Sequence, residues 1–323
     1  MSRPKPKVFV TRNIPEPGLS ILHQNCNVHI HSGMVVPRQE LMKKMKEYDA
    51  ILCMLGDRVD SKLIESAGSK LKIISCYSVG YDYVDIGAAS KKEIIVTNTP
   101  HVLAHTTADL TFSLILSVAR NIVTADTYIR TKKWKFGWMP ELFLGYDVYG
   151  STLGIIGLGE IGSLVAKRAK GFNMNVLYYS RSRNFDLELE IGIKYCSLER
   201  LMKESDFVSI HVDLNKDSLH LIDNKKIGLM KKTAFIINTS RGKIINENHL
   251  IDALKNGRIA GAGLDVYDRE PILHSNPLLK MSNVVILPHI GSATYRTRSQ
   301  MSEIAVYNIL NFFRNKKPVY KVN

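Results

Sequence analysis

The stretch that decides the fold is "TLGIIGLGEIGSLVAKRAKG", residues 152–171. An apolar, strand-like run leads into the pattern G-x-G-x-x-G at Gly157, Gly159 and Gly162, and a helical segment follows that we expect to end on Gly171. The three glycines allow a tight turn, close approach of the backbone to a pyrophosphate, and close packing of helix on strand. Amides at the helix N-terminus would bind phosphate. This context favours a dinucleotide site over a tight turn without a ligand.

The next strand-like run, "NVLYYS", leads into "SRSR", residues 180–183. An acidic residue at this position would bind the ribose hydroxyls of NAD, and the sequence has hydroxyls and guanidiniums instead. These groups suit a 2′-phosphate, so we predict that NADPH is preferred and that NADH is also used. A solvated turn that ignores the ribose is the alternative. From these two segments we expect cofactor contacts by Leu158, Gly159, Glu160, Ile161, Ser180, Arg181 and Ser182.

Strand-like runs alternate with helical patterns on both sides of this stretch, which predicts βαβ units and parallel sheets. The strand-like runs before it are "KVFVTR", "AILCML", "KIISCY" and "IIVTN", and those after it include "FVSIHV", "TAFIINTS", "AGAGLDV" and "NVVILPH". A long helical pattern from about His101 and an aromatic, glycine-rich segment separate the two series. The last segment has a helical apolar stripe, which we expect to pack back on the first domain, at Met301, Ile304, Ala305, Ile309 and Phe312.

The composition is that of a globular protein with two domains. The chain has 323 residues, of which 45% are hydrophobic and 23% are charged. No apolar run reaches the roughly 20 residues that a membrane-spanning helix needs, and the first residues contain no signal-peptide pattern. We therefore expect a cytoplasmic protein without a membrane partner.

The net charge of +14 raises the question of a nucleic-acid partner. The lysines are spread along the chain in short pairs, which favours solvated helix faces, and we expect no nucleic-acid binding. The excess charge would also attract a small anionic substrate. Four widely spaced cysteines, Cys26, Cys53, Cys76 and Cys196, are expected to be buried thiols rather than disulfides or metal ligands, so no metal site is predicted.

Three segments place chemically versatile residues just after strand-like runs: "NTSRG" with Arg241, "GLDVYDREP" with Asp265 and Glu270, and "LPHIGSAT" with His289. Ligands of open α/β sheets bind outside the carboxyl ends of strands. An arginine can hold a carboxylate with two hydrogen bonds, and a histidine oriented by a glutamate can exchange a proton with a substrate oxygen. Each residue alone could have a purely structural role: Arg241 in a surface ion pair, Glu270 as a loop carboxylate and His289 as a core histidine. Together they predict a catalytic set.

With these motifs in this order, the chain resembles the D-2-hydroxyacid dehydrogenases, and more closely their glyoxylate/hydroxypyruvate reductase branch, which includes the archaeal glyoxylate reductases. The segments "KVFVTRNIP", "SVGYDYVD", "TTADL" and "FLGYDVYG" extend the resemblance over nearly the whole chain. It implies an α/β fold of two doubly wound parallel-sheet domains, with a Rossmann domain inserted in a flavodoxin-like substrate domain. The implied boundaries are 1–101 with 290–323 for the substrate domain, and 102–289 for the Rossmann domain, including a dimerisation arm near 121–150.

The resemblance also implies roles for individual residues. Arg241 matches the substrate arginine, His289 the acid/base and Glu270 its partner. Substrate-binding positions in addition to Arg241 and His289 are Leu55, Val79, Gly80 and Trp138, the tryptophan being one that in related reductases reaches the active site of the other subunit of a homodimer. Further cofactor-binding positions are Thr107, Thr239, Ser240, Arg241 and Asp265, of which Asp265 matches a contact to the nicotinamide carboxamide. The chain departs from many relatives at Asp213, where they carry a proline beside the adenine pocket.

The expected reaction is reduction of a small 2-keto acid, glyoxylate or hydroxypyruvate, to the 2-hydroxy acid, glycolate or D-glycerate, with NADPH or NADH. Two alternatives remain open: another D-2-hydroxyacid dehydrogenase such as 3-phosphoglycerate dehydrogenase, and an NAD-binding corepressor of the same fold. Formate dehydrogenases pair their histidine with glutamine, whereas this chain has Glu270. The sequence does not rank the two keto acids, and it does not give the direction of the reaction in the cell.

Overall fold

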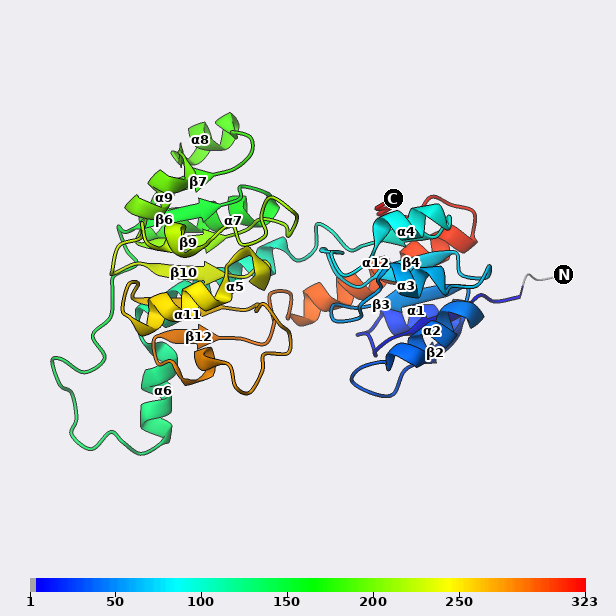
Figure 1. The fold of residues 1–323 in the computed structure, drawn as a ribbon, viewed down its shortest axis with the longest axis horizontal. Coiled ribbons are helices and arrows are strands. Elements are labelled where there is room, and N and C mark those ends of the chain that lie inside the picture. The colour runs from blue at the N-terminus through cyan, green and yellow to red at the C-terminus, as the bar shows by residue number, and fades with distance from the viewer. Residues whose placement is uncertain (1–3) are drawn as a thin grey trace. The chain divides into compact units, whose positions relative to one another are not determined.

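A computed structural model describes residues 4–323, which form two compact units (Figure 1). The larger unit is Ala104–Ser292, and the smaller unit combines the chain up to Leu103 with Ala293–Asn323. Both are built on parallel sheets, so the predicted α/β class with two doubly wound sheets is confirmed.

The larger unit has a seven-stranded sheet in the order β12-β11-β10-β9-β6-β7-β8. The chain runs outward from β6 to β8 and then crosses back to β9, so the strand order reverses between β6 and β9. Ligands bind at such a reversal in doubly wound folds. The strands are β6 Thr152–Ile156, β7 Asn175–Tyr179, β8 Lys194–Tyr195, β9 Phe207–Ile210, β10 Phe235–Asn238, β11 Gly261–Leu264 and β12 Val284–Ile286.

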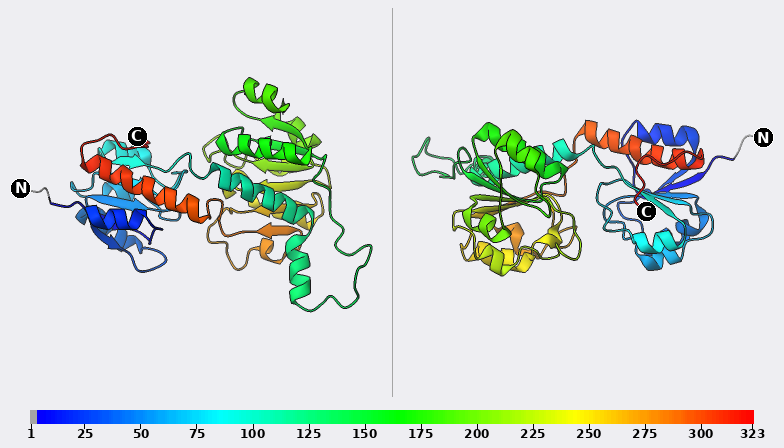
Figure 2. Two further views of the ribbon diagram at one scale, coloured as in Figure 1. Left: turned by 180° about the vertical axis from the view of Figure 1, so that it is seen from behind. Right: turned by 90° about the horizontal axis from the view of Figure 1, so that it is seen from above.

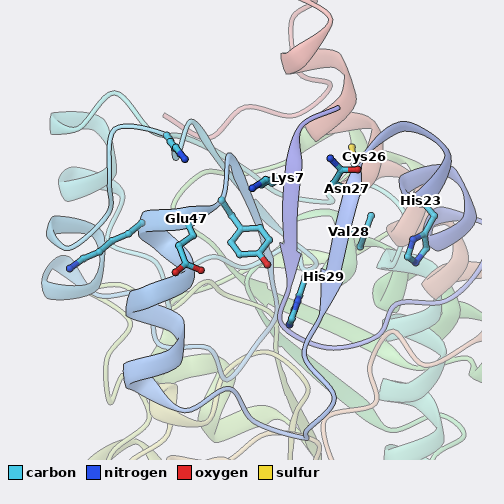
Figure 3. A pocket seen from close by; sticks show the side chains of 10 residues that line it. Lys7, His23, Cys26, Asn27, Val28, His29 and Glu47 are labelled. Atoms are coloured by element: carbon cyan, nitrogen blue, oxygen red, sulfur yellow. The ribbon is translucent and has the colours of Figure 1, made fainter. Parts of the chain in front are cut away.

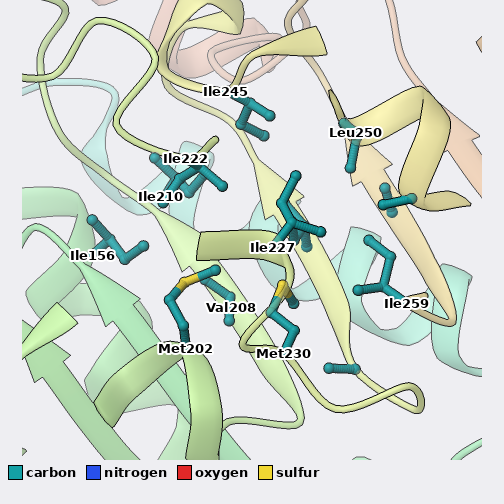
Figure 4. Packing of buried hydrophobic residues seen from close by; sticks show 14 of the residues in the cluster. Ile156, Met202, Val208, Ile210, Ile222, Ile227, Met230, Ile245, Leu250 and Ile259 are labelled. Atoms are coloured by element: carbon teal, nitrogen blue, oxygen red, sulfur yellow. The ribbon is translucent and has the colours of Figure 1, made fainter. Parts of the chain in front are cut away.

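Helices cover both faces of this sheet (Figure 2), which is why its central strands are apolar on both sides. Successive residues of one strand enter two different cores, since side chains alternate across a strand. Ile156 belongs to the core under α9, α10 and α11, part of which is drawn in Figure 4, and Ile155 belongs to the core under α5 and α7. The helices are α5 Ala104–Ala119, α6 Ile122–Arg130, α7 Glu160–Ala169, α8 Phe185–Ile191, α9 Leu198–Glu204, α10 Asn224–Ile227 and α11 Glu247–Lys255.

The smaller unit has a five-stranded sheet in the order β2-β1-β3-β4-β5, the flavodoxin-like order. Its strands are β1 Lys7–Val10, β2 Asn27–Ile30, β3 Ala50–Cys53, β4 Ile73–Cys76 and β5 Ile95–Thr97, and its helices are α1 Gly18–Asn25, α2 Arg38–Glu47, α3 Ser61–Glu65, α4 Ile86–Lys91 and α12 Tyr295–Phe313. All four cysteines of the chain are free and buried, as predicted.

The C-terminal helix α12 completes the smaller unit by packing on α1 and β4. Ala305 and Ile309 are buried in this contact, and Met301 of the same helix is also buried. The Ser75 hydroxyl of β4 donates a hydrogen bond to the carbonyl of Ala305, with an oxygen–oxygen distance of 2.9 Å. Gly18 allows α1 to approach closely, because a Cβ at this position would lie 2.5 Å from the Ser302 hydroxyl oxygen.

Several elements differ from the sequence expectation. The strands β2 and β8 were not predicted, because the edge strand β2 has no fully buried residue and β8 has only two residues. The helix α7 ends at Ala169 rather than at Gly171, and a 3-10 turn, Lys170–Phe172, follows it. The left-handed residue that ends this turn is Asn173, with φ +51°. Asparagine tolerates this conformation better than most residues do.

The predicted arm consists of α6 and the segment 131–150, which has turns but no helix or strand (Figure 2). No residue of α6 is buried. Large apolar side chains are exposed along the segment that follows, among them Phe136, Trp138 and Leu144. In the described part of the chain no single helix is long and apolar enough to span a membrane. The pair α5 and α6, bent by 65°, meets the criteria of length and composition only when taken together.

Candidate active site

The glycine-rich turn after β6 has the shape that a pyrophosphate site requires. Gly157 has φ +95°, and a Cβ there would lie 2.3 Å from the carbonyl oxygen of His211. A Cβ at Gly162 would lie 2.1 Å from the carbonyl oxygen of Gly157, so the start of α7 packs directly on the turn. A Cβ at Gly159 would meet no atom within 4 Å. The protein's own packing thus requires glycine at the first and third positions, and the second faces open space.

The start of α7 adds favourable electrostatics to this turn. Gly159 is the N-cap residue, and it has no side chain that could cap the helix. The partial positive charge of a helix N-terminus stabilises bound phosphate. The residues present therefore fit the pyrophosphate of a dinucleotide, and Leu158, Gly159, Glu160 and Ile161 all lie at this turn.

The segment after β7 contains two arginines in different environments. Arg183 binds Glu188 with both prongs, at nitrogen–oxygen distances of 3.1 and 2.6 Å, and its guanidinium lies 4.5 Å from the ring centroid of Phe185. Arg181 is exposed and makes no hydrogen bond or ion pair with another residue of the described chain. Ser180 and Ser182 flank it. The structure thus favours Arg181 over Arg183 as a cation for a ribose phosphate.

The turn that carries Arg241 is closed by a residue that the sequence did not single out. The Asn238 side chain at the end of β10 accepts a hydrogen bond from the amide of Ser240 at 3.0 Å and donates one to the carbonyl of Arg241 at 2.9 Å. The glycine after Arg241 has a steric reason, because a Cβ on Gly242 would lie 1.9 Å from the carbonyl carbon of Tyr267. Gly242 thereby lets the Arg241 turn press against the segment that leads to Glu270.

Glu270 and His289 are in direct contact. Their Oε2 and Nδ1 atoms lie 2.7 Å apart, and the side chains are 35% and 25% exposed. The other carboxylate oxygen of Glu270 accepts a hydrogen bond from the amide of Tyr267 at 3.2 Å. His289 has φ +54°, a left-handed conformation that is uncommon outside glycine and concentrates at functional sites. Because Nδ1 is bound to the carboxylate, Nε2 is the ring atom left for a substrate.

Asp265 fixes the loop that carries His289. Its buried carboxylate accepts hydrogen bonds from the amides of Ile290, at 2.7 Å, and Gly291, at 2.8 Å. Burial raises the pKa of this carboxyl, and the two amide hydrogen bonds oppose that rise. Thr107 donates to the carbonyl of Gly291 at 3.1 Å. Asp265 and Thr107 therefore hold the loop itself, and their contact with a cofactor stays a prediction.

Two further predicted cofactor residues also make internal contacts. The Thr239 hydroxyl is 3.0 Å from that of Thr111 on α5, and the Ser240 hydroxyl donates to the carbonyl of Val212 at 2.9 Å. These bonds tie the Arg241 turn to α5 and to the segment after β9. Arg241, Glu270 and His289 are thus presented from neighbouring turns at the carboxyl edge of the larger sheet.

The remaining predicted substrate residues lie in other parts of the chain. Leu55, Val79 and Gly80 belong to the smaller unit, where they follow β3 and β4, and Trp138 is 86% exposed in the arm. The carbonyls of Val79 and Gly80 accept hydrogen bonds from the side chains of Asn98, at 2.8 Å, and Ser78, at 2.7 Å. Both carbonyls of this loop are thus held by the unit's own side chains.

Two cavities lie away from these residues. One, of about 710 Å³, is in the smaller unit (Figure 3), and most of its lining precedes or begins the strands: Lys7, His23, Cys26, Asn27, Val28, His29, Lys46, Glu47, Tyr48 and Lys70. The other, of about 270 Å³, lies at the amino ends of strands of the larger sheet, and its lining includes Gly150, Ser151, Asp206 and Phe207. Neither is lined by a predicted site residue. Ligands of such sheets bind at the carboxyl ends, which argues against both cavities as the active site.

A glycine-rich turn at the strand-order reversal, with an arginine and a histidine–carboxylate pair on neighbouring turns, defines a nicotinamide-dependent oxidoreductase. Comparison with known proteins agrees. Residues 112–291 match the family described as D-isomer specific 2-hydroxyacid dehydrogenase, NAD binding domain, and the chain belongs to this family.

The chain is also similar to individual members over its full length. It is 48% identical to the glyoxylate reductase of Korarchaeum cryptofilum, covering 99% of this chain and 96% of the relative, and 49% identical to that of Pyrococcus horikoshii, with the same shares. Among solved structures, it is similar to an NADPH-dependent glyoxylate/hydroxypyruvate reductase from Sinorhizobium meliloti in complex with NADP and malonate. The TM-score is 0.86 and the identity 28%, covering 99% of this chain and 97% of the other.

Proposed function

We propose that this protein reduces glyoxylate to glycolate, that it also accepts hydroxypyruvate, and that it prefers NADPH to NADH. The observation that carries the proposal is the 2.7 Å contact of His289 with Glu270 on a turn that neighbours the one of Arg241. The glyoxylate reductases that the chain resembles over its full length support the choice of substrate. The larger unit is the dinucleotide-binding domain in this proposal, and the smaller unit is the substrate domain.

Arg241 and His289 have different roles in the reduction. The Arg241 guanidinium holds the keto acid and stabilises negative charge that develops on its C2 oxygen. His289, charged and held by Glu270, gives that oxygen a proton from Nε2. When bound, the reduced nicotinamide supplies a hydride. Leu55, Val79 and Gly80 of the smaller unit contact the substrate, and backbone amides of Val79 and Gly80 bind its carboxylate.

A steady-state screen tests the substrate. Glyoxylate, hydroxypyruvate, pyruvate and 3-phosphohydroxypyruvate are each supplied with NADPH and with NADH, and cofactor oxidation is followed by absorbance. We expect the highest kcat/KM with glyoxylate or hydroxypyruvate. Exclusive use of the phosphorylated keto acid would indicate a 3-phosphoglycerate dehydrogenase, and cofactor binding without turnover of any keto acid would indicate a corepressor-like protein.

Glu270→Gln is expected to lower kcat with glyoxylate and to leave binding of NADPH unchanged. The Glu270 carboxylate lies 2.7 Å from Nδ1 of His289 and only accepts hydrogen bonds, whereas a glutamine amide both donates and accepts and no longer fixes the orientation of the ring. The rate is measured with saturating glyoxylate, with Glu190→Gln on α8 as the control. A kcat of Glu270→Gln equal to that of the unchanged enzyme would exclude Glu270 from the mechanism.

Arg181→Asp is expected to invert the cofactor preference. Arg181, after β7, has no ionic partner among residues 4–323, and a charge-assisted hydrogen bond to phosphate contributes about 1.5 to 3 kcal/mol, a roughly tenfold to hundredfold preference. Solvent screening at this exposed position reduces that figure, so NADH remains usable. An aspartate withdraws the cation and repels the phosphate. The test is kcat/KM for both cofactors.

Arg183→Ala serves as the matched variant, because Arg183 is already bound to Glu188, and it should change the preference less. A clear preference of the unchanged enzyme for NADH would show that residues 180–183 form a solvated turn. The pairing of Arg183 with Glu188 supports Arg181 alone, rather than both arginines, as the cation for the phosphate.

We further propose a cytoplasmic homodimer joined through the arm of α6 and 131–150. The side chains of Phe136, Trp138 and Leu144 are each exposed, and a second copy would bury their apolar area. A mass of about 36 kDa in analytical ultracentrifugation, which is that of a single chain, would contradict this.

A further inference from the structure

A partly buried ion pair lies at the carboxyl ends of β1 and β3 in the smaller unit. The Arg12 guanidinium donates to Oδ1 of Asp57 at 2.5 Å, and the Thr11 hydroxyl donates to Oδ2 at 2.5 Å. The Asp57 side chain is 2% exposed and that of Arg12 is 24% exposed. Neither residue belongs to the catalytic set described above.

The ion pair is hydrogen-bonded to a tight turn formed by residues 54–57. The amide of Asp57 donates to the carbonyl of Met54 at 3.0 Å, and Gly56 has φ +94°, the arrangement of a type II turn. The Asp57 carboxylate accepts a hydrogen bond from the amide of Met54 at 2.8 Å, and Arg12 donates to the carbonyl of Leu55 at 3.1 Å. The ion pair therefore holds both the start and the centre of the turn.

These contacts leave the outward side of the turn open. Within the described chain, the amides of Leu55 and Gly56 make no hydrogen bond, and Gly56 is exposed. Two adjacent amides of this kind, beside a guanidinium, favour an anionic ligand. The turn follows the carboxyl end of β3, and ligands of such sheets bind at the carboxyl ends of strands.

Only arginine has the geometry for this position. Its Nε donates to the carbonyl of Met34 at 2.8 Å, while its two terminal nitrogens reach Leu55 and Asp57. A lysine has a single nitrogen, which cannot occupy the three separate positions from which the guanidinium nitrogens donate. Asp57 depends on this partner, because removing the arginine leaves a buried carboxylate without a compensating charge.

We propose that Arg12 is a positioning residue for the keto acid: with Asp57, it sets the orientation of the Leu55 and Gly56 turn against the substrate. This inference rests on the proposed function, in which Leu55 contacts the substrate. It predicts that loss of Arg12 weakens binding of the keto acid and leaves binding of the cofactor unchanged, since misplacement of a substrate-contacting turn lowers efficiency without removing a reacting group.

The test compares Arg12→Ala and Arg12→Lys with the control Arg38→Ala. Arg38 also pairs with an aspartate, Asp60, and donates to the carbonyl of Arg58 at 2.8 Å, but it does not touch the turn. KM and kcat for glyoxylate, KM for NADPH and the melting temperature are measured for each. We expect KM for glyoxylate to rise roughly tenfold or more in Arg12→Ala, with an intermediate rise in Arg12→Lys and no rise in Arg38→Ala.

A wild-type KM for glyoxylate in Arg12→Ala, with or without a lower melting temperature, would overturn the inference, because the ion pair would then only stabilise the fold. If Arg12→Ala does not fold, Arg12→Lys decides in the same way. An equal rise in KM for NADPH would also contradict a role confined to the keto acid. Failure of the unchanged enzyme to reduce any keto acid is a separate result that rejects the proposed function itself.

Discussion

Replacement of His289 by alanine is expected to lower kcat with glyoxylate by roughly 10²-fold to 10⁴-fold, the usual contribution of general acid catalysis. The reason is the position of the ring, whose Nδ1 is 2.7 Å from Glu270 and whose loop is fixed by Asp265. The measurement is steady-state turnover, together with the Kd of NADPH from the quenching of protein fluorescence. The Kd should not change.

The control is His274→Ala, which removes an exposed histidine of the same unit. It should leave kcat unchanged. Near-normal turnover of His289→Ala would show that another group, or water, protonates the substrate. A large increase in the Kd of NADPH would mean that the substitution disturbs the fold of the cofactor site, and the fall in kcat would then lose its interpretation.

Arg241→Lys is the second substitution with a large expected effect, although it conserves charge. A guanidinium holds a carboxylate with two parallel hydrogen bonds, and an ammonium cannot reproduce that geometry. Loss of a charged hydrogen bond costs about 1.5 to 3 kcal/mol. We therefore expect kcat/KM for glyoxylate to fall roughly tenfold to hundredfold. The loss should appear with the keto acid and not in the affinity for NADPH.

Arg258→Lys provides the matched substitution, because Arg258 forms ion-pair and amide contacts with Asp252 and Asn224 on the surface of the same unit. It should behave as the unchanged enzyme does. If Arg241→Lys also retains full kcat/KM, Arg241 is a structural residue of the β10 turn, and the proposed grip on the substrate is wrong.

The fold was predictable where local sequence determines local structure. Gly157 and Gly162 of the turn after β6 are required by close contacts with the segment after β9 and with the turn itself, and the buried strands are continuous apolar runs. The strand β2 was not predictable in this way, because it lies at the sheet edge and is only half-buried. Its pairing with β1 depends on the assembled sheet rather than on its own residues.

In the candidate site, too, some features were predictable from the sequence and others were not. Glu270 and His289 were predicted as a pair and are in contact. The loop-holding role of Asp265 was not foreseen, because its partners are backbone amides 25 and 26 residues further along the chain, which carry no sequence signal. The engagement of Arg183 by Glu188 was equally hidden, since either arginine of residues 180–183 looks the same until a fold places a carboxylate beside one of them.

The central claim is transfer of a hydride to C2 of a 2-keto acid, with the proton supplied by His289. The most direct test is to incubate the purified protein with glyoxylate and NADPH that carries deuterium at both C4 positions, and to analyse the product by mass spectrometry and proton NMR. We expect glycolate with one deuterium at C2, formed in near-stoichiometric amount with the cofactor oxidised, and little product from His289→Ala. Glycolate without deuterium at C2, or oxidation of the cofactor without glycolate, would contradict it.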